Sequence, residues 1–382
     1  MKINQDHSSY LSTHELNKLP LWDRVAKERR LLSCYLEITA RCNNNCRHCY
    51  INVPAGDDAS KRSELSSDAI KRIAAQAVSL GALWCGVTGG EPLLRKDFVD
   101  IYLYLKKIGL LISVFTNATL ITKEHIELFK KYPPRDIEVT VYGVTKETYE
   151  RVTRLPGSFD AFMKGVNLLL DNGIKTRFKT VALRSNVHEL DEISKFCRER
   201  TKDFFRFDPF LHLRFDGNRK RNKEIISERL SPEEIVDIEK KNTSRFQELK
   251  RKCNTFIRSK EMHRGSCHHL FFCGAGNRSF IVSANGLFRL CSALWHSDCI
   301  YDLTKGTVRE AYENFVPRVR NRRLDRKELL EKCTICPIIN LCMWCPGNAY
   351  LETGDLNMPV EYFCKVAYAR KEMLEAAVYG NS

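Results

Sequence analysis

Three cysteines in one short segment have the residue type and the spacing for metal chemistry. Cys42, Cys46 and Cys49 lie within eight residues, directly after the apolar stretch 36–40. Thiolates at this spacing can bind three irons of one [4Fe–4S] cubane from a single loop. No fourth cysteine follows nearby, so one iron would keep an open position, which distinguishes a reactive metal centre from a structural one. A zinc-binding loop is the alternative that the spacing leaves open.

A second candidate motif follows the apolar segment 83–88. It consists of Thr88 and then Gly89, Gly90, Glu91 and Pro92. The two glycines let the backbone approach a ligand closely, and the Glu91 carboxylate can accept a hydrogen bond from an ammonium group. Taken alone, such a motif is equally a surface turn with an exposed glutamate.

Together, the cysteine spacing and the Gly-Gly-Glu-Pro motif resemble the radical S-adenosylmethionine (SAM) enzymes. In that family the open iron binds the amine and carboxylate of SAM, and an electron from the cluster splits SAM to a 5′-deoxyadenosyl radical. The resemblance implies that the Gly-Gly-Glu-Pro segment binds the methionine amine. His48 stands where relatives place an aromatic ring near the adenine, and Tyr50, after the third cysteine, is a further cofactor-binding candidate.

The resemblance implies further SAM contacts at the ends of later strands. Asn117 lies in a Thr-Asn-Ala segment where relatives have Thr-Asn-Gly. Because Ala118 replaces that glycine, we expect the turn to avoid positive φ there. Thr140 can supply the hydroxyl that relatives place near the SAM ribose or carboxylate, although Tyr142 stands where they often have aspartate.

The carboxylate of SAM requires a cation, and the sequence offers two. Arg151 or Arg154 could pair with it, and spacing does not decide between them; Arg151 is taken as the candidate. The catalytic acid, base or hydrogen donor stays unknown. Asp208, Asp216 and Tyr142 are candidates only because they lie near predicted strand ends.

The other large group of cysteines lies in the last third of the chain. Its eight members are Cys267, Cys273, Cys291, Cys333, Cys336, Cys342, Cys345 and Cys364. Their array resembles the SPASM extension of radical SAM enzymes, apart from one gap that is a residue shorter than in many relatives. The resemblance assigns Cys267, Cys273, Cys291 and Cys345 to a [4Fe–4S] cluster near the barrel, and Cys333, Cys336, Cys342 and Cys364 to an outer one. Two tetrahedral zinc sites are the alternative.

Five cysteines lie outside these two groups. Cys34, Cys85 and Cys197 fall in apolar strand or helix patterns, so we expect them to be packed in the core. Cys253 and Cys299 lie in less clear surroundings.

These motifs must be positioned by alternating strands and helices. Strands are predicted at 34–40, 83–88, 111–116, 137–142, 175–183 and 204–211, and helices near 66–80, 96–108, 122–131, 159–172 and 187–200. Six such units predict an α/β fold, a partial (β/α)6 TIM-like barrel, with ligands at the carboxyl ends of its strands. Gly81, Gly109 and Gly173 are expected to end helices in the left-handed conformation.

The predicted domain order follows from these patterns. It is an N-terminal lead-in at 1–33, a radical SAM partial barrel at 34–215, a helical bridge at 216–265, a small irregular SPASM domain with two auxiliary clusters at 266–366, and a C-terminal helix or tail at 367–382. Ser231 and Pro232 have the pattern of a helix start within the bridge.

Composition narrows the class of protein. The chain has 382 residues, 43% hydrophobic and 29% charged, which is ordinary for a soluble globular protein. It has no apolar run long enough for a membrane span and no apolar signal core, so we expect a cytoplasmic protein. The net charge of +15 includes basic runs at 214–223, 245–252 and 318–327. Because these runs lack interleaved aromatics, we interpret them as solvated surface and expect no nucleic-acid partner.

The resemblance implies a radical enzyme with SAM and three [4Fe–4S] clusters, one that binds SAM and two auxiliary ones. Extended members of the family mostly modify peptides by crosslinking, epimerisation or oxidation, so a ribosomally made peptide is the expected substrate. Two partner proteins are expected too. One is an external electron donor of the flavodoxin or ferredoxin type, and the other is a separate protein that binds the leader part of the peptide. Oxidation or decarboxylation of a small molecule or tetrapyrrole is the alternative. Ser292 replaces the aspartate of sulfatase-activating relatives, which disfavours formylglycine formation because serine is a poor base.

Replacement of the three loop cysteines tests the radical hypothesis. We expect the variant Cys42→Ala, Cys46→Ala and Cys49→Ala to release no 5′-deoxyadenosine from SAM, because no thiolate remains to hold the reactive cluster. The measurement is nucleoside release after anaerobic reconstitution with reductant. Equal release by the variant and the parent would contradict the hypothesis.

Overall fold

The structure is a computed structural model that describes residues 28, 30–202, 205–251 and 269–379. Nearly all of the predicted lead-in lies outside the described residues, as do Cys253 and Cys267. Among the helices described, none has the length and apolarity to cross a bilayer.

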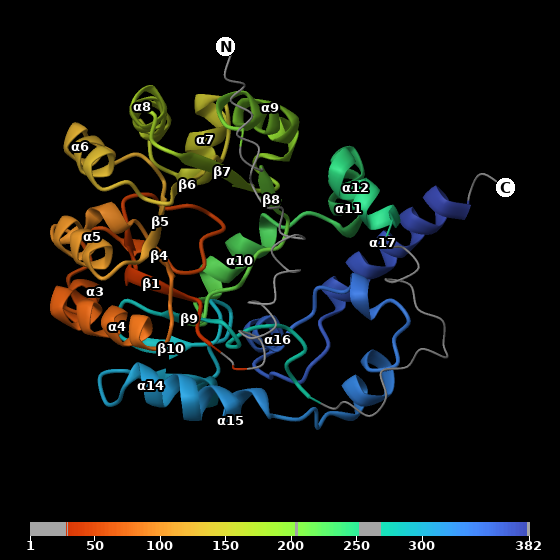
Figure 1. Ribbon diagram of the computed structural model, residues 1–382. Helices are drawn as coiled ribbons and strands as arrows, with labels where there is room; N and C mark the ends of the chain where they lie inside the picture. The colour runs from red at the N-terminus through yellow and green to blue at the C-terminus, as the bar shows by residue number, and fades with distance from the viewer. Residues whose placement is uncertain (1–27, 29, 203–204, 252–268, 380–382) are drawn as a thin grey trace, which may run out of the picture.

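A parallel sheet forms the centre of the molecule (Figure 1). All six predicted strands are present and neighbour one another in chain order. They are β1 (Ser33–Thr39), β4 (Trp84–Gly89), β5 (Leu111–Thr116), β6 (Asp136–Thr140), β7 (Thr176–Val181) and β8 (Arg206–Asp208). Each pairs in parallel with the next. This large parallel sheet in a mixed α/β fold is consistent with the predicted partial barrel.

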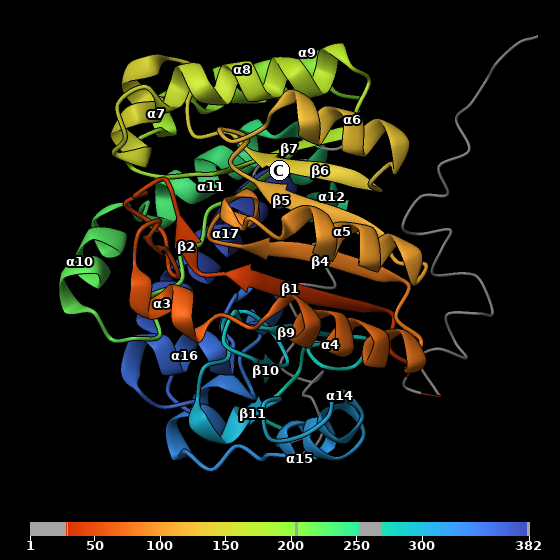
Figure 2. The same ribbon diagram turned by 90° about the vertical axis from the view of Figure 1, so that its left-hand side faces the viewer.

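Helices cover the outer face of this sheet (Figure 2). The predicted helices are present as α4 (Ser67–Ser79), α5 (Phe98–Lys107), α6 (Lys123–Lys131), α8 (Ser158–Asp171) and α9 (Leu190–Arg200). In α4, the Ser66 side chain caps the first turn, and the buried residues are spaced for one helix face. Gly81, Gly109 and Gly173 have φ of 104°, 89° and 66°, which confirms the predicted helix ends.

Two short helices were not anticipated from the sequence. They are α3 (Asp58–Ser63) and α7 (Lys146–Thr153). Each spans about two turns, too short for a clear apolar period. Asp57 and Thr145 cap their first turns through side-chain hydrogen bonds.

The cysteine-rich last third of the chain extends the same sheet. β9 (Ser279–Val282) pairs in parallel with β1, and β10 (Leu287–Arg289) and β11 (Ile300–Asp302) follow in antiparallel order. The sheet therefore has nine strands in the order β11-β10-β9-β1-β4-β5-β6-β7-β8. These added strands have only three or four residues each, so they carry little periodic signal in the sequence.

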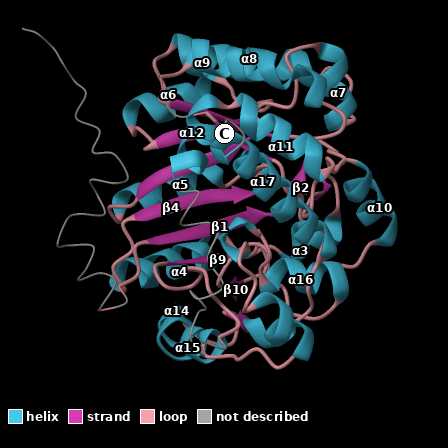
Figure 3. Ribbon diagram, turned by 90° about the vertical axis from the view of Figure 1, so that its right-hand side faces the viewer, coloured by secondary structure: helices cyan, strands magenta, loops and turns pink. Residues whose placement is uncertain are grey.

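Helices of the second half lie on the opposite side of the sheet from α4, α5 and α6 (Figure 3). They include α10 (Arg219–Ser227), α11 (Pro232–Lys241), α12 (Thr243–Arg251), α16 (Pro346–Thr353) and α17 (Glu361–Tyr379). The predicted start of α11 is confirmed, because Ser231 and Glu234 form a capping box around Pro232. Next to β11 lie α14 (Val308–Glu310) and α15 (Val316–Arg320).

A buried ion pair joins the first strand to the added strands. Arg289 of β10 donates to Glu37 of β1 at 2.7 Å, and their side chains are only 0% and 6% exposed. Arg289 also donates to the Ser292 carbonyl and lies 3.5 Å from the centre of the Trp295 ring. Burial raises the pKa of Glu37 and lowers that of Arg289. Each charge therefore depends on the other for compensation.

We expect Glu37→Gln to lower the free energy of unfolding by about 3–5 kcal/mol, because it leaves the Arg289 charge buried without a counter-ion. Chemical denaturation followed by circular dichroism measures this. The matched control is Glu127→Gln, whose partner is Lys130 in an exposed pair at 3.4 Å; its expected effect is about 0–1 kcal/mol. Equal effects of the two substitutions would show that the buried pair is dispensable.

Candidate active site

The cysteine segment forms a loop at the carboxyl end of β1. It starts in β2 (Arg41–Cys42), which pairs in parallel with β3 (Val53–Pro54). The Asn45 amide donates to the Thr153 carbonyl at 2.9 Å, and the Arg47 amide donates to the Val152 carbonyl at 3.1 Å. The end of α7 therefore supports the middle of the loop.

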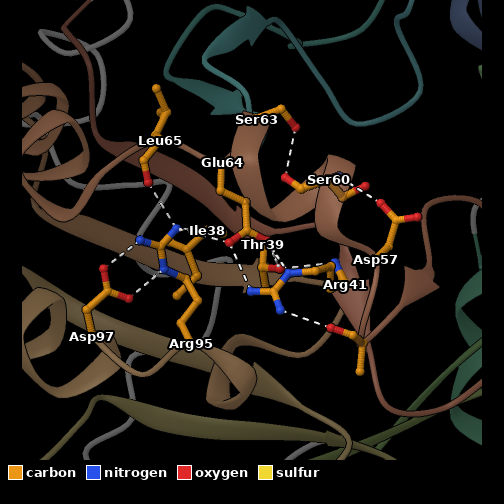
Figure 4. Close-up of polar contacts among 11 residues, drawn as sticks. Ile38, Thr39, Arg41, Asp57, Ser60, Ser63, Glu64, Leu65, Arg95 and Asp97 are labelled. Carbon is orange, nitrogen blue, oxygen red and sulfur yellow. Dashed lines mark hydrogen bonds and ion pairs between the residues drawn. The ribbon is translucent and has the colours of Figure 1, made fainter.

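Arg41, directly before the first cysteine, fixes the start of the loop (Figure 4). Its guanidinium makes two hydrogen bonds to the Glu64 carboxylate, at 2.8 and 3.0 Å, and a third to the Ala55 carbonyl at 3.0 Å. Glu64 also accepts from the Thr39 hydroxyl. Nearby, Arg95 donates to the Ile38 carbonyl at 2.8 Å. Such two-pronged pairs between arginine and carboxylate restrict orientation as well as distance.

Arg214 and Arg221, on either side of the predicted boundary between barrel and bridge, hold the other end of the loop. Arg221 of α10 donates to the Cys46 carbonyl at 2.7 Å and to Asn52 at 3.2 Å. Arg214 donates to the Asn52 carbonyl at 3.1 Å and is itself buried. The interpretation of the run 214–223 as solvated surface is therefore wrong for these two residues. Their role had no signal in the sequence, because the contact spans about 170 residues of chain.

Gly89 and Gly90 let two parts of the backbone meet. A Cβ atom on Gly89 would lie 2.0 Å from the Thr39 carbonyl oxygen, and one on Gly90 would lie 2.3 Å from that of Arg41. The Gly90 and Glu91 amides donate to the Thr39 and Arg41 carbonyls at 2.8 and 2.9 Å. The close approach that these glycines permit is thus first of all to the chain's own cysteine loop.

Glu91 organises the next strand end rather than the cavity wall. Its side chain is 0% exposed and accepts from the Leu93 amide, the Thr116 hydroxyl and the Asn117 amide at 2.8–3.1 Å. Burial raises the pKa of Glu91 to about 7. Its position identifies it as the residue that fixes the turn at Asn117.

The expectation for Ala118 is wrong. Its φ is 63°, in the left-handed region. Two hydrogen bonds stabilise this turn. The Thr119 amide donates to the Asn117 side-chain oxygen, and the Ala118 amide donates to the Thr116 hydroxyl. Gly165 of α8 leaves room for it, since a Cβ there would lie 1.9 Å from the Ala118 carbonyl oxygen. Hydrogen bonds within the turn, together with the space that Gly165 leaves, therefore permit a conformation that alanine rarely adopts.

A cavity of about 550 Å³ lies at the carboxyl ends of the strands. The candidates that line it are Cys42, Cys46, His48, Cys49, Tyr50, Gly89, Gly90, Asn117, Thr140, Tyr142 and Asp208. Lining residues that sequence reasoning missed include Asn44, Lys179, Arg206, His212 and Asn348. Asn44 belongs to the cysteine loop itself. The other four come from β7, β8, the segment after β8 and α16, which only the folded chain brings to the first loop.

Several other candidates do not line this cavity. Glu91 and Pro92 are buried beside it, Arg151 is exposed on α7, and Arg154 pairs with Glu224 of α10 at 3.0 Å. Asp216 pairs with Arg214 at 2.6 Å. The structure therefore does not place Arg151 or Arg154 where a ligand in this cavity would meet them.

Buried polar atoms face the cavity without protein partners. Among the described residues, the side-chain amide of Asn44 and Nδ1 of His48 make no hydrogen bond. The His48 ring lies 5.1 Å from the Tyr142 ring, and burial lowers the pKa of His48 to about 4. Unpaired buried polar groups are costly, so this wall is suited to a polar ligand.

The C-terminal cysteines gather into two groups. The Cys273 thiol raises the pKa of both Cys291 and Cys345, beyond the effect of their burial. Cys342 is within hydrogen-bonding reach of Cys364.

Cys333 belongs with the group of Cys342 and Cys364. Burial is the largest cause of its raised pKa, and the nearby Cys364 and Cys336 thiols raise it further. In the described part of the chain, no three potential ligand side chains converge on one metal ion. A cubane makes a different demand, since each thiolate binds its own iron.

The three cysteines predicted to pack in the core are buried. Cys34 and Cys85 are buried and face each other in register across β1 and β4, and Cys197 is buried in α9. Cys299 is buried too.

Gly90→Ala tests the contact between the strand end and the cysteine loop. We expect it to lower the free energy of unfolding by about 1–3 kcal/mol, because the added methyl group forces the Arg41 carbonyl away. We also expect less iron per chain after reconstitution, measured by metal analysis. Gly56→Ala is the control, since nothing lies within 4 Å of its Cβ position. Unchanged iron content in Gly90→Ala would refute the role of this contact.

Comparison with known proteins agrees with this geometry. Residues 36–197 match the family model of the Radical SAM superfamily. The AdoMet-dependent heme synthase of Methanosarcina barkeri is 27% identical over 341 residues, which cover 84% of this chain and 92% of that protein. The antilisterial bacteriocin subtilosin biosynthesis protein AlbA of Bacillus subtilis is 24% identical over 373 residues, covering 91% and 73%.

A solved structure has the same fold. Streptococcus suis SuiB, bound to precursor peptide SuiA, aligns with a TM-score of 0.63 at 16% identity, over 88% of this chain and 76% of that one. The chain is therefore an enzyme in which residues 36–197 form a radical SAM domain.

Proposed function

We propose that this enzyme modifies a ribosomally made peptide by hydrogen abstraction, with crosslinking, epimerisation or oxidation as the outcome. The observation that carries the proposal is the charge balance of a long, two-chambered cavity. The cytoplasm is the proposed compartment, because the fourteen cysteines in the described part of the chain are all free thiols, which suits a reducing environment.

The radical SAM domain implies SAM and one [4Fe–4S] cluster, which together supply a 5′-deoxyadenosyl radical. Cys42, Cys46 and Cys49 would hold the cluster. His48, Tyr50, Asn117, Thr140 and the backbone of Gly89 and Gly90 would contact SAM, since all of them line the cavity. The unpaired Asn44 amide supports the fit, because a polar cofactor would satisfy it.

Two auxiliary [4Fe–4S] clusters are part of the proposal. Cys273, Cys291 and Cys345, with Cys267, would hold the inner one. Cys333, Cys336, Cys342 and Cys364 would hold the outer one. Support comes from Cys342 and Cys345, which are neighbours in sequence but associate with different cysteines. A cavity of about 440 Å³ beside them is lined by cysteines of both sets.

A second chamber extends the active-site cavity. It measures about 390 Å³ and is lined by Gly274, Phe280 and Cys291 among others. Tyr50, Thr88, Phe115, Lys179 and Ser292 line both chambers. A substrate could therefore extend from the cysteine loop to the inner cysteine group, as a length of peptide would.

The cations on the cavity wall already have partners. Among the described lining residues, the cations are Lys179 and Arg206. Lys179 lies 2.5 Å from Glu138, and Arg206 lies 3.4 Å from Asp208. A tetrapyrrole with several propionates would need free cations, whereas a peptide backbone needs hydrogen bonds. This balance favours the peptide.

The alternative substrate is a tetrapyrrole or another small molecule, supported by the 27% identity to the heme synthase. For the peptide reaction we propose an external electron donor of the flavodoxin or ferredoxin type and a separate protein that binds the leader. SuiB, which has the same fold, was solved with a precursor peptide.

The test supplies the anaerobically reconstituted enzyme with SAM, reductant and either of two probes. One is a synthetic short peptide, chosen by sequencing the genes that flank this chain's gene, and the other is an iron porphyrin with propionate side chains. We expect 5′-deoxyadenosine together with a changed mass or a changed configuration of the peptide. Conversion of the porphyrin alone would establish the alternative instead.

A further inference from the structure

His212 is a titratable side chain of the cavity wall that the assignments above leave without a role. It lies four residues beyond β8, at the carboxyl end of the sheet, and lines the main chamber. Its ring and that of Tyr50 form a T-shaped pair, with ring centres 5.9 Å apart and planes at 83°. It is therefore held next to the loop that carries the three cysteines.

A hydrogen bond fixes the orientation and tautomer of this ring. Nδ1 of His212 lies 2.6 Å from Oδ1 of Asn348, in the first turn of α16. An amide oxygen only accepts, so Nδ1 carries the proton and Nε2 carries a lone pair. Among the described residues, Nε2 has no protein partner.

The backbone of this segment is fixed from the other side. Arg229 donates to the Leu211 carbonyl at 3.1 Å and pairs with Glu352 of α16. Burial and four groups from the elements packed against His212 act on its pKa. Burial lowers its pKa, Asn348, Asp208 and Glu352 raise it, and Arg229 lowers it. The net direction is downward, which keeps the imidazole neutral near neutral pH.

The other titratable groups of the wall are engaged or unsuited to accept a proton. Asp208 pairs with Arg206, and Lys179 pairs with Glu138. Burial raises the pKa of Tyr50 and of Tyr142, so both keep their protons. Ser292 is a poor base. His212 is thus the described wall residue outside the cysteine loop that combines a neutral state with an open lone pair.

We propose that Nε2 of His212 accepts a proton from the substrate during the radical reaction. The donor is an O–H, N–H or S–H group next to the carbon from which hydrogen has been abstracted, or the nucleophile that attacks that carbon. The X–H bond breaks, its electron pair stays on X, and an N–H bond forms on the imidazole. The extra electron density then makes the substrate radical easier to oxidise. The inference rests on the proposed peptide function and adds a residue to it.

The first experiment separates proton transfer from radical formation. His212→Gln keeps a polar side chain but cannot take up the proton. We expect the variant still to release 5′-deoxyadenosine. Deuterium from a deuterated form of the peptide named above should still appear in that nucleoside. Product per deoxyadenosine should fall about 100-fold or more. His188→Gln, at a half-exposed histidine bonded to Thr148, should match the parent.

The pH profile gives a second readout that a purely structural role would not move. In the parent, product formation should fall as pH drops through the pKa of His212, below the usual value of about 6.5. Asn348→Asp places a carboxylate at Nδ1, which raises that pKa, so the fall should begin at higher pH. His212→Gln should show no such fall. Unchanged product ratios, or identical acid limbs in all three proteins, would overturn the proposal.

A third measurement does not depend on the substrate. Diethyl pyrocarbonate acylates neutral imidazole, and peptide mapping of the treated holoenzyme locates the modified histidine. We expect modification of His212 at pH 6–7, with less in the presence of the peptide. If the parent converts neither probe, the proposed peptide function fails, and the acylation experiment still tests His212 by itself. Absence of His212 modification between pH 6 and 8 would show that Nε2 is not accessible and would overturn the proposal.

Discussion

The contact between the end of β1 and the end of β4 is the constraint on which the rest of the site depends. The carbonyls of Thr39 and Arg41 lie against Gly89 and Gly90 so closely that neither glycine has space for a Cβ atom. Because the cysteine loop begins at Arg41, this contact sets where the three thiols lie relative to the strand ends. The pair between Arg41 and Glu64 then fixes the direction in which the loop leaves the sheet.

The second half of the chain completes the site that the first half begins. β9 adds to the free side of β1, and the buried pair between Arg289 and Glu37 joins the two halves within the sheet. Arg221 of α10 binds the Cys46 carbonyl, while Asn348 of α16 reaches His212. The regions that resemble a separate bridge and a separate extension in sequence therefore provide walls and supports of one cavity. A radical intermediate requires such enclosure, since water and oxygen would otherwise quench it.

Much of the fold followed from local patterns. The six parallel strands, five of the covering helices, the left-handed helix ends and the start of α11 were all predicted, because periodicity and capping are short-range properties. The turn at Ala118 was predicted wrongly, because contacts with Thr116 and Gly165 outweigh the intrinsic preference of alanine. The short strands β9 to β11 were missed, since three or four residues carry too little period.

The sequence by itself determined the chemistry available to this protein: three thiols at cubane spacing, a Gly-Gly-Glu-Pro motif at a strand end, and the eight cysteines of the C-terminal array. These are facts of residue type and local spacing, which survive without a fold. Only the tertiary structure decided which side chains reach the cavity. In the folded chain the Glu91 carboxylate binds the turn at Asn117, and Arg151 stays on the surface. Lys179, His212 and Asn348 line the cavity. The physical reason is that convergence of distant strand ends depends on packing, which no local pattern records.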